Sequence, residues 1–478
     1  MQSGPTPTAL LSTILLAAYF VCSALAIHAE GGEPPYFAIT NARIFTVSGA
    51  VIENGTVVVA KGLIQAVGAD SKIPAEAWII DGKGLSVYPG LIDAGTDLGL
   101  PKSDESHGGA HSNVDRAHPA MGPEDRPYST PWRIAADELK PDDKRIADWR
   151  NAGFTSTLAL PSGGIFPGQG SLIDLGDERA GEMVVRSHDA VPLSFQTSGS
   201  FYGYPDSLMG ALAYMRQVLD DTRWYTASEA TYEAHRNGIA RIPYDHTEHF
   251  LDKSLERQEI FLIPANNQVQ IVRALLVAKE WNVPAAVWGG QQGYAVASAI
   301  AAAKVPVLVS LKWPAKGKDP DPEQEQPLRD LRFRDRAPGT PAEFVKAGVK
   351  FAFYSDGLEA PKDIRKNLKR AMDAGLSADA ALRAFTLDAA QILGAGDVMG
   401  SIEPGKIANL VITDGDLFGE KTKIKHVFVD GRWYPVHEET PPDKPVEPKP
   451  ARAAIDDVAA SNSSNAAASR AAQARVAQ

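Results

Sequence analysis

The sequence predicts an α/β fold, namely a (β/α)8 TIM-like barrel with a small β-sandwich assembled from N- and C-terminal segments. Between residues 87 and 396, short apolar stretches alternate with amphipathic ones. Such alternation is typical of βαβ units around a parallel sheet that is buried on both faces. Short β-branched runs flank this region on both sides. A chain of 478 residues is long enough for a barrel with an attached smaller domain.

The N-terminal segment, residues 1–29, is expected to be a signal peptide or an N-terminal anchor. Residues 9–27 form an apolar run with the length of a signal-peptide core, and Ala24-Leu25-Ala26 is a suitable cleavage site. Because residues 1–8 contain no Lys or Arg, an uncleaved membrane anchor is the alternative. We therefore expect an exported protein, periplasmic or extracellular. The one cysteine, Cys22, lies in this run, which excludes disulfides in the rest of the chain.

The small β-sandwich is expected in two halves, residues 36–88 and 399–436. Three β-branched runs separated by Gly and Asn turns make up the first half. The second half contains Asp430-Gly431, a strong hairpin signal between two further runs. Residues 438–478 are rich first in Pro, Lys and Glu and then in Ala, Ser and Asn, so we expect a disordered tail.

The barrel is expected over residues 89–398. Its strand candidates are 91–94, 155–160, 191–195, 260–263, 285–288, 305–311 and 351–354. Its helix candidates are 205–221, 267–280, 293–303, 341–347, 361–374 and 378–392. An eighth, weak strand is expected between residues 321 and 336. Two long loops, 101–128 and 316–338, follow the first and sixth strands, at the end where barrels build their sites.

Three stretches resemble the amidohydrolase superfamily. Residues 87–100 are similar to its first barrel strand, in which Pro-Gly-Leu-Ile-Asp-Ala precedes His-Thr-His, and residues 400–411 are similar to its Gly-Ser-Ile-Glu-x-Gly-Lys-x-Ala-Asp-Leu-Val motif. The Gly168-Gln169-Gly170 loop resembles that of the imidazolonepropionase-like and Xaa-Pro-dipeptidase-like branch. The resemblance covers about residues 36–434. It implies a hydrolase of non-peptide or dipeptide-like C–N bonds.

The resemblance also implies a metal site, but most of the expected ligands differ. Gly95 and Asp97 stand where the family has its first two histidines, and the fifth and sixth strands end without a histidine. Asp356 matches the catalytic aspartate of the last strand. Asp97 and Asp356 are therefore the candidate metal ligands, with Asp356 as acid–base. Two carboxylates make a poor zinc site but could contribute to an oxygen site for Mg²⁺ or Ca²⁺ with water. A divalent metal, Zn or Mg/Mn, is therefore one expectation and a metal-free site the other.

Lys312 is the second catalytic candidate. It stands near the end of the sixth strand, so its ammonium group could lie between Asp97 and Asp356 in place of a metal. Two close carboxylates without a cation would repel each other. The alternative is a solvated lysine, because most lysines are exposed.

The remaining site candidates are weighed against structural roles. Gly168, Gln169 and Gly170 could bind substrate through backbone N–H groups, or could let a hairpin turn tightly. Trp288, at the end of the fifth strand, is the fourth candidate for substrate binding. A metal could also draw ligands from His107, His111 and His118 in the first long loop. His246 and His249 are better explained as a solvated surface, because their neighbours are uniformly polar.

Two functions remain open from the sequence. One is an exported hydrolase with a divergent metal site, and the other is a catalytically degenerate homologue that binds a ligand or a partner subunit. A small-molecule substrate is expected in the first case, with self-association or an intact amidohydrolase relative as protein partners. The net charge of −11 argues against a nucleic-acid-binding surface.

Overall fold

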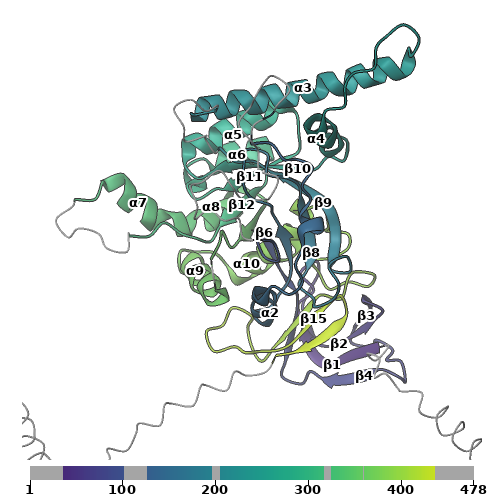
Figure 1. Ribbon diagram of the computed structural model, residues 1–478. Helices are drawn as coiled ribbons and strands as arrows, with labels where there is room; N and C mark the ends of the chain where they lie inside the picture. The colour runs from purple at the N-terminus through teal and green to yellow at the C-terminus, as the bar shows by residue number, and fades with distance from the viewer. Residues whose placement is uncertain are drawn as a thin grey trace, which may run out of the picture. The chain divides into compact units, whose positions relative to one another are not determined.

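The computed structural model describes residues 36–101, 126, 128–195, 205–316, 325–358 and 360–436 (Figure 1). Three expectations lie outside these residues: the signal peptide or anchor at 1–29, the disordered tail at 438–478, and nearly all of the loop at 101–128. Among the helices that are described, none combines the length and the apolar character needed to cross a membrane.

An eight-stranded sheet forms a nearly closed barrel, which confirms the predicted fold class. Its spatial order is β13-β12-β11-β10-β9-β8-β7-β6. The strands are β6 (Leu91–Thr96), β7 (Phe154–Ala159), β8 (Gly170–Asp174), β9 (Val184–Pro192), β10 (Ile260–Ala265), β11 (Ala285–Gly289), β12 (Val307–Ser310) and β13 (Phe351–Tyr354). All seven strand candidates of the sequence overlap strands of this sheet.

The eighth strand was predicted in the wrong place. It is β8, which pairs antiparallel with both β7 and β9, whereas the other neighbouring strands run parallel. The region 321–336 instead contains helix α7 (Leu328–Arg336), and β12 pairs directly with β13. Alternating Arg and Asp with leucines three residues apart suits an exposed helix better than a buried strand, and no residue of α7 is buried.

A second eight-stranded sheet unites the two ends of the described chain. Its strands are β1 (Tyr36–Ile44), β2 (Ile52–Ala60), β3 (Leu63–Gly68), β4 (Trp78–Asp81), β5 (Ser86–Pro89), β14 (Leu410–Thr413), β15 (Ile424–Val429) and β16 (Arg432–Pro435). The two halves join where β5 pairs antiparallel with β14. The predicted hairpin is confirmed, since Asp430 and Gly431 connect β15 to β16 with φ of 47° and 75°.

Asp174 connects the barrel to this second sheet. The Asp174 carboxylate on β8 accepts hydrogen bonds from Ser156 Oγ on β7 at 2.6 Å and from Asn409 Nδ2 at 2.9 Å. Asn409 directly precedes β14, and its Oδ1 accepts from the backbone N–H of Asp430 at 2.8 Å. Burial raises the pKa of Asp174 to about 7, although both hydrogen bonds oppose the rise.

Helices cover the barrel on the connections between its strands. They are α2 (Lys144–Asn151), α3 (Leu208–Ala234), α4 (His246–Glu256), α5 (Gln268–Trp281), α6 (Ala297–Ala303), α8 (Thr340–Ala347), α9 (Pro361–Asp373), α10 (Ala378–Phe385) and α11 (Leu387–Ile392). Helix α3 is longer than expected, and α4 was not predicted. The helix expected over 378–392 is interrupted at Thr386, where φ is −130° and ψ is −97°.

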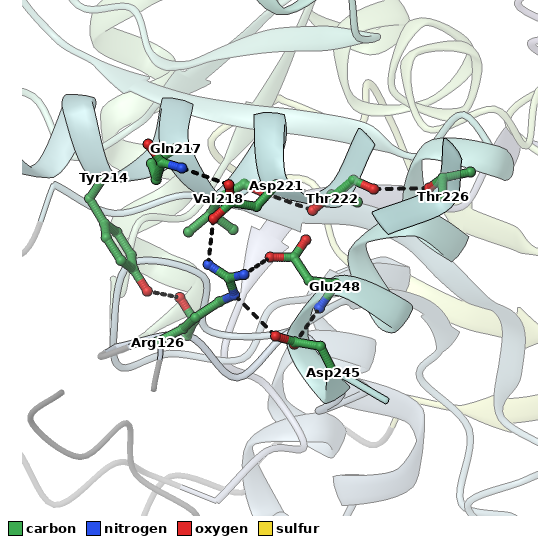
Figure 2. Close-up of polar contacts among 10 residues, drawn as sticks. Arg126, Tyr214, Gln217, Val218, Asp221, Thr222, Thr226, Asp245 and Glu248 are labelled. Atoms are coloured by element: carbon green, nitrogen blue, oxygen red, sulfur yellow. Dashed lines mark hydrogen bonds and ion pairs between the residues drawn. The ribbon is translucent and has the colours of Figure 1, made fainter. Parts of the chain in front are cut away.

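Arg126 ties the connection after β6 to helices α3 and α4 (Figure 2). Its guanidinium donates to Asp221 of α3 at 2.9 Å, lies 3.6 Å from Asp245 before α4, and forms an ion pair with Glu248 of α4. Only 2% of the Glu248 side chain is exposed. Burial raises the pKa of Glu248 to about 7, with hydrogen bonding to Thr222 and the Arg126 charge acting against the rise.

Candidate functional site

A cleft with a volume of about 730 Å³ lies at the carboxyl ends of β6, β7, β11 and β13. Barrel proteins bind small molecules at this end of the sheet. The residues that define its chemistry are Asp97, Arg145, Leu160, Trp288, Tyr354 and Asp356. Three of the candidates from the sequence, Asp97, Trp288 and Asp356, therefore share one cavity.

Asp356 follows β13 in a left-handed backbone conformation, with φ of 53°. Aspartate tolerates this conformation better than most residues. Its Oδ2 accepts a hydrogen bond from Ser310 Oγ, at the end of β12, at 2.7 Å. Burial raises the pKa of Asp356, while the Ser310 hydrogen bond and the charge of Lys312 reduce the rise. A carboxyl group with a raised pKa that faces a cavity can donate or accept a proton near neutral pH.

Asp97, just beyond β6, is held by Arg145 of α2. Arg145 donates from Nη1 to Asp97 Oδ1 at 2.9 Å and from Nη2 to the Asp97 carbonyl oxygen at 3.1 Å. The same guanidinium donates to Asp143 at 2.7 to 3.1 Å. Asp143 caps α2 and also accepts from the backbone N–H of Gly99 at 3.1 Å. The Asp97 carboxylate is therefore part of a fixed ion-pair network on one wall of the cleft.

The predicted Asp97–Lys312–Asp356 arrangement is not formed. Lys312 is exposed, and no ion pair joins its ammonium group to either carboxylate within the described part of the chain. Its charge still reaches Asp356 at longer range. The cation beside Asp97 is Arg145 instead, and no sequence pattern pointed to this pair, because 48 residues separate the two. A catalytic role for Lys312 remains a prediction.

Trp288 lies at the end of β11, on the cleft, beside Tyr354 of β13. The two ring centroids are 5.8 Å apart, with the ring planes at 49°. The Trp288 Nε1 is buried and has no hydrogen-bond partner among the described residues. Burial, and then the neighbouring Asp356 charge, raise the pKa of Tyr354 well above its usual value, so its phenol stays neutral. These rings give the cleft an aromatic surface.

Gly168, Gln169 and Gly170 are not part of the described cleft lining. The Gln169 side chain is buried, where Nε2 donates to the Pro131 carbonyl oxygen at 2.8 Å and Oε1 lies 2.6 Å from His188 Nδ1. Gly168 has φ of 138°, and a Cβ there would lie 2.6 Å from the Arg133 carbonyl oxygen. The geometry matches the alternative in which the glycines shape the β7–β8 connection. Residues 161 and 162 of the same connection do line the cleft.

The described strand ends do not fit a zinc site of nitrogen or sulfur ligands. A Cβ on Gly95 would lie 3.1 Å from Leu160 Cδ1, so a larger residue at this position requires the Leu160 side chain to shift. Asp97 already pairs with Arg145. No group of three or more His, Cys, Asp and Glu residues suited to a metal occurs in the described ranges.

The structure describes two of the five histidine candidates. His246 and His249 lie on α4, where the exposed His246 ring stacks on Trp132 with centroids 4.5 Å apart. This agrees with a surface role. His107, His111 and His118 lie outside the described residues, so their contribution to any metal site stays a prediction.

Asp93 of β6 is a buried carboxyl group that the sequence analysis did not single out. It lies below the cleft, and its Oδ1 accepts from the backbone N–H of Ser355, after β13, at 3.0 Å and from that of Gly95 at 3.3 Å. β6 and β13 are the two ends of the strand order, so Asp93 bridges the gap that nearly closes the barrel. Burial raises its pKa to about 6 against these hydrogen bonds. The sequence signal that could have identified Asp93 is an acidic residue within an otherwise apolar strand.

The fold and the cleft define a barrel protein with a cavity at the carboxyl ends of its strands. A family model described as "Amidohydrolase family" matches residues 338–434, which include Asp356. The imidazolonepropionase of Geobacillus kaustophilus (strain HTA426) is 26% identical over 383 residues, or 76% of this chain and 84% of that protein.

Solved structures show the same fold. An amidohydrolase from Thermotoga maritima MSB8 has a TM-score of 0.69 at 24% identity, covering 83% of this chain and 99% of that one. A second amidohydrolase has a TM-score of 0.52 at 17% identity, covering 84% and 100%. The match over residues 338–434 and the shared fold agree with the resemblance to the amidohydrolase superfamily that the sequence motifs indicated.

Proposed function

We propose that the protein binds a small molecule in the cleft at the carboxyl ends of β6, β11 and β13, without hydrolysing it by a histidine-held metal. One observation carries the proposal. The positions where the resemblance expects metal ligands hold Gly95 against Leu160 and Asp97 in an ion pair with Arg145, yet the cavity beside them measures about 730 Å³. A cavity of this size suits a drug-sized or metabolite-sized ligand.

Metal analysis of the purified full chain tests this proposal. We expect substoichiometric zinc, manganese and magnesium, and an unfolding temperature that a chelator does not change. One stoichiometric metal, lost in both Asp97→Asn and Asp356→Asn but kept in Asp220→Asn, would overturn it. Asp220 is a suitable control because its side chain is 72% exposed and lies on α3, away from the cleft.

A second candidate function is hydrolysis of a C–N bond with Asp356 as acid–base. It is favoured by the raised pKa of Asp356, its place on the cleft wall and its hydrogen bond from Ser310. Turnover of N-acyl amino acids, cyclic amides and dipeptides decides between the two. Chelator-resistant turnover that is abolished in Asp356→Asn would establish this second function. No turnover by the wild type, with binding retained, supports the first.

We also propose that the protein is exported, on the basis of the apolar run at residues 9–27. Fractionation of cells expressing the full chain tests this. Recovery of all the protein from the cytoplasm would contradict it, and recovery with the membrane would favour the uncleaved anchor.

A further inference from the structure

We propose that the ligand of the cleft is a small organic cation, an ammonium group carried on an apolar or aromatic body. This inference rests on the proposed binding function and names the chemical class that the cleft would take. It is drawn from the charges and the aromatic rings of the described lining.

The charge of the lining is negative once its ion pairs are counted. Arg145 brings one positive charge, and its Nε, Nη1 and Nη2 all donate to Asp97 or Asp143. Asp356, on the cleft as well, receives the Ser310 hydroxyl but no arginine or lysine ion pair among the described residues. A cation on the ligand would supply the missing charge, and half-burial would strengthen the attraction over that in water.

Lys312 does not neutralise the negative charge of Asp356. Its ammonium group is exposed and forms no part of the described lining, although its charge lowers the pKa of Asp356 to some extent. Solvent and salt screen an exposed charge at this range. The carboxylate of Asp356 is therefore the strongest unmatched charge that the described wall presents to the cavity.

The aromatic surface suits the rest of such a ligand. Trp288 and Tyr354 both line the cavity with their ring planes at 49°, and Trp288 is the more exposed of the two. An electron-rich ring face attracts a cation, and the indole of tryptophan does so most strongly. Leu160 adds an aliphatic contact from the β7 side. An ammonium group near Asp356 and an apolar body over Trp288 would satisfy both parts of the wall.

An anionic ligand fits the same wall poorly. Four of the five N–H groups of Arg145 already donate to Asp97 or Asp143, so an anion would compete with two carboxylates for the guanidinium charge. It would also face the Asp356 carboxylate. A neutral ligand would gain the aromatic contact but would leave the Asp356 charge unmatched.

Three probes of one shape test the inference: phenethylamine as the cation, 2-phenylethanol as the neutral analogue and phenylacetate as the anion. Calorimetry with the full chain measures each affinity. We expect phenethylamine to bind at least about tenfold more tightly than the other two. In Asp356→Asn this preference should fall by about tenfold, because the variant removes the charge and keeps the shape. Asp220→Asn, an exposed carboxylate of α3, should leave the preference unchanged.

Trp288→Leu separates this inference from the proposed function. It should weaken all three probes, because it removes an aromatic face and leaves the charge of Asp356. If phenylacetate or 2-phenylethanol binds as tightly as phenethylamine or more tightly, and Trp288→Leu abolishes that binding, the inferred cationic ligand is wrong. The proposed small-molecule binding would still stand. Unchanged phenethylamine affinity in Asp356→Asn, or no phenethylamine binding at about 10 mM, would also overturn the cationic ligand. The metal and turnover measurements decide the proposed function independently.

Discussion

Two arginines of this protein each hold more than one carboxylate, in different surroundings. Arg126 lies between α3 and α4, where Asp221, Asp245 and Glu248 all point toward its guanidinium (Figure 2). Arg145 lies on the wall of the cleft and pairs with Asp97 and Asp143. Arg145 lines the described cleft together with a further carboxylate, Asp356. The ion pairs of Arg126 hold two helices together, whereas those of Arg145 lie where a bound ligand could contact them.

Removal of Arg126 should have the largest effect on stability. Arg126→Ala leaves Glu248 buried without its cation and brings three acidic side chains together without compensation. We expect a loss of about 4 kcal/mol in the free energy of unfolding, measured by urea denaturation at pH 7.5.

Arg145→Ala is the matched control for that measurement. The Arg145 side chain is 26% exposed and that of Asp97 is 45% exposed, so water replaces the lost ion pair in part. We expect a loss of only about 1 kcal/mol. Equal losses at the two arginines would contradict the distinction between an enclosed cluster and an open cleft wall.

Asp174 extends the comparison to a buried carboxyl group whose hydrogen-bond donors, Ser156 and Asn409, are neutral. Its pKa is about 7 in the folded protein and 3.8 in the unfolded reference. The folded state therefore holds a proton that the unfolded state has lost between these values, and the stability from this group falls as pH rises toward 7. In Asp174→Asn the loss is absent.

The variant is compared with the wild type in urea at pH 5 and at pH 8. From pH 5 to pH 8 the wild type should lose about 3 kcal/mol of stability that Asp174→Asn keeps. The loss accumulates over the roughly two pH units between pH 5 and the pKa of Asp174. Asp414→Asn, at the exposed aspartate that follows β14, should show no such difference from the wild type. A difference that does not vary with pH would show that Asp174 is ionised in the folded protein.

The sequence predicted most of the barrel because hydrophobic runs of strand length carry their own signal. It failed at β8, where the five residues Gly170–Asp174 run antiparallel to their neighbours, since strand direction depends on a partner strand that the local pattern does not encode. It also predicted Asp97, Trp288 and Asp356 on one cavity, because the ends of parallel strands gather at one edge of a sheet.

The contacts of the site were harder to predict. Lys312 was placed near the carboxylates from its strand, but the direction of a long side chain is set by packing and solvent. Arg145 lies on helix α2, 48 residues after its partner Asp97. Asp93 accepts a hydrogen bond from the backbone N–H of Ser355, which is 262 residues away in the sequence. Pairings of this kind depend on tertiary structure, so the spacing of residues in the sequence does not reveal them.

The variant Gly95→His tests whether the cleft wall has room for a histidine ligand at this position. Gly95→His should cost about 2 kcal/mol in urea denaturation, because its Cβ would lie 3.1 Å from Leu160 Cδ1 and its ring must displace that side chain. In the background Leu160→Ala, the same change should cost about 1 kcal/mol less, since the truncation opens space. Independent costs in this double-mutant cycle would mean that Leu160 does not fill the site.

Lys312→Gln should have the smallest effect. Because Lys312 is exposed and lacks an ion pair with the described carboxylates, we expect the free energy of unfolding to stay within about 0.5 kcal/mol of the wild type. Its charge nevertheless lowers the pKa of Asp356, so the variant should raise that pKa. A carboxyl-group titration by NMR measures the change, with Lys346→Gln on the exposed face of α8 as the control. A lowered or unchanged pKa would place the Lys312 charge out of reach of the cleft, and a large loss of stability would restore the ion-paired lysine that the sequence suggested.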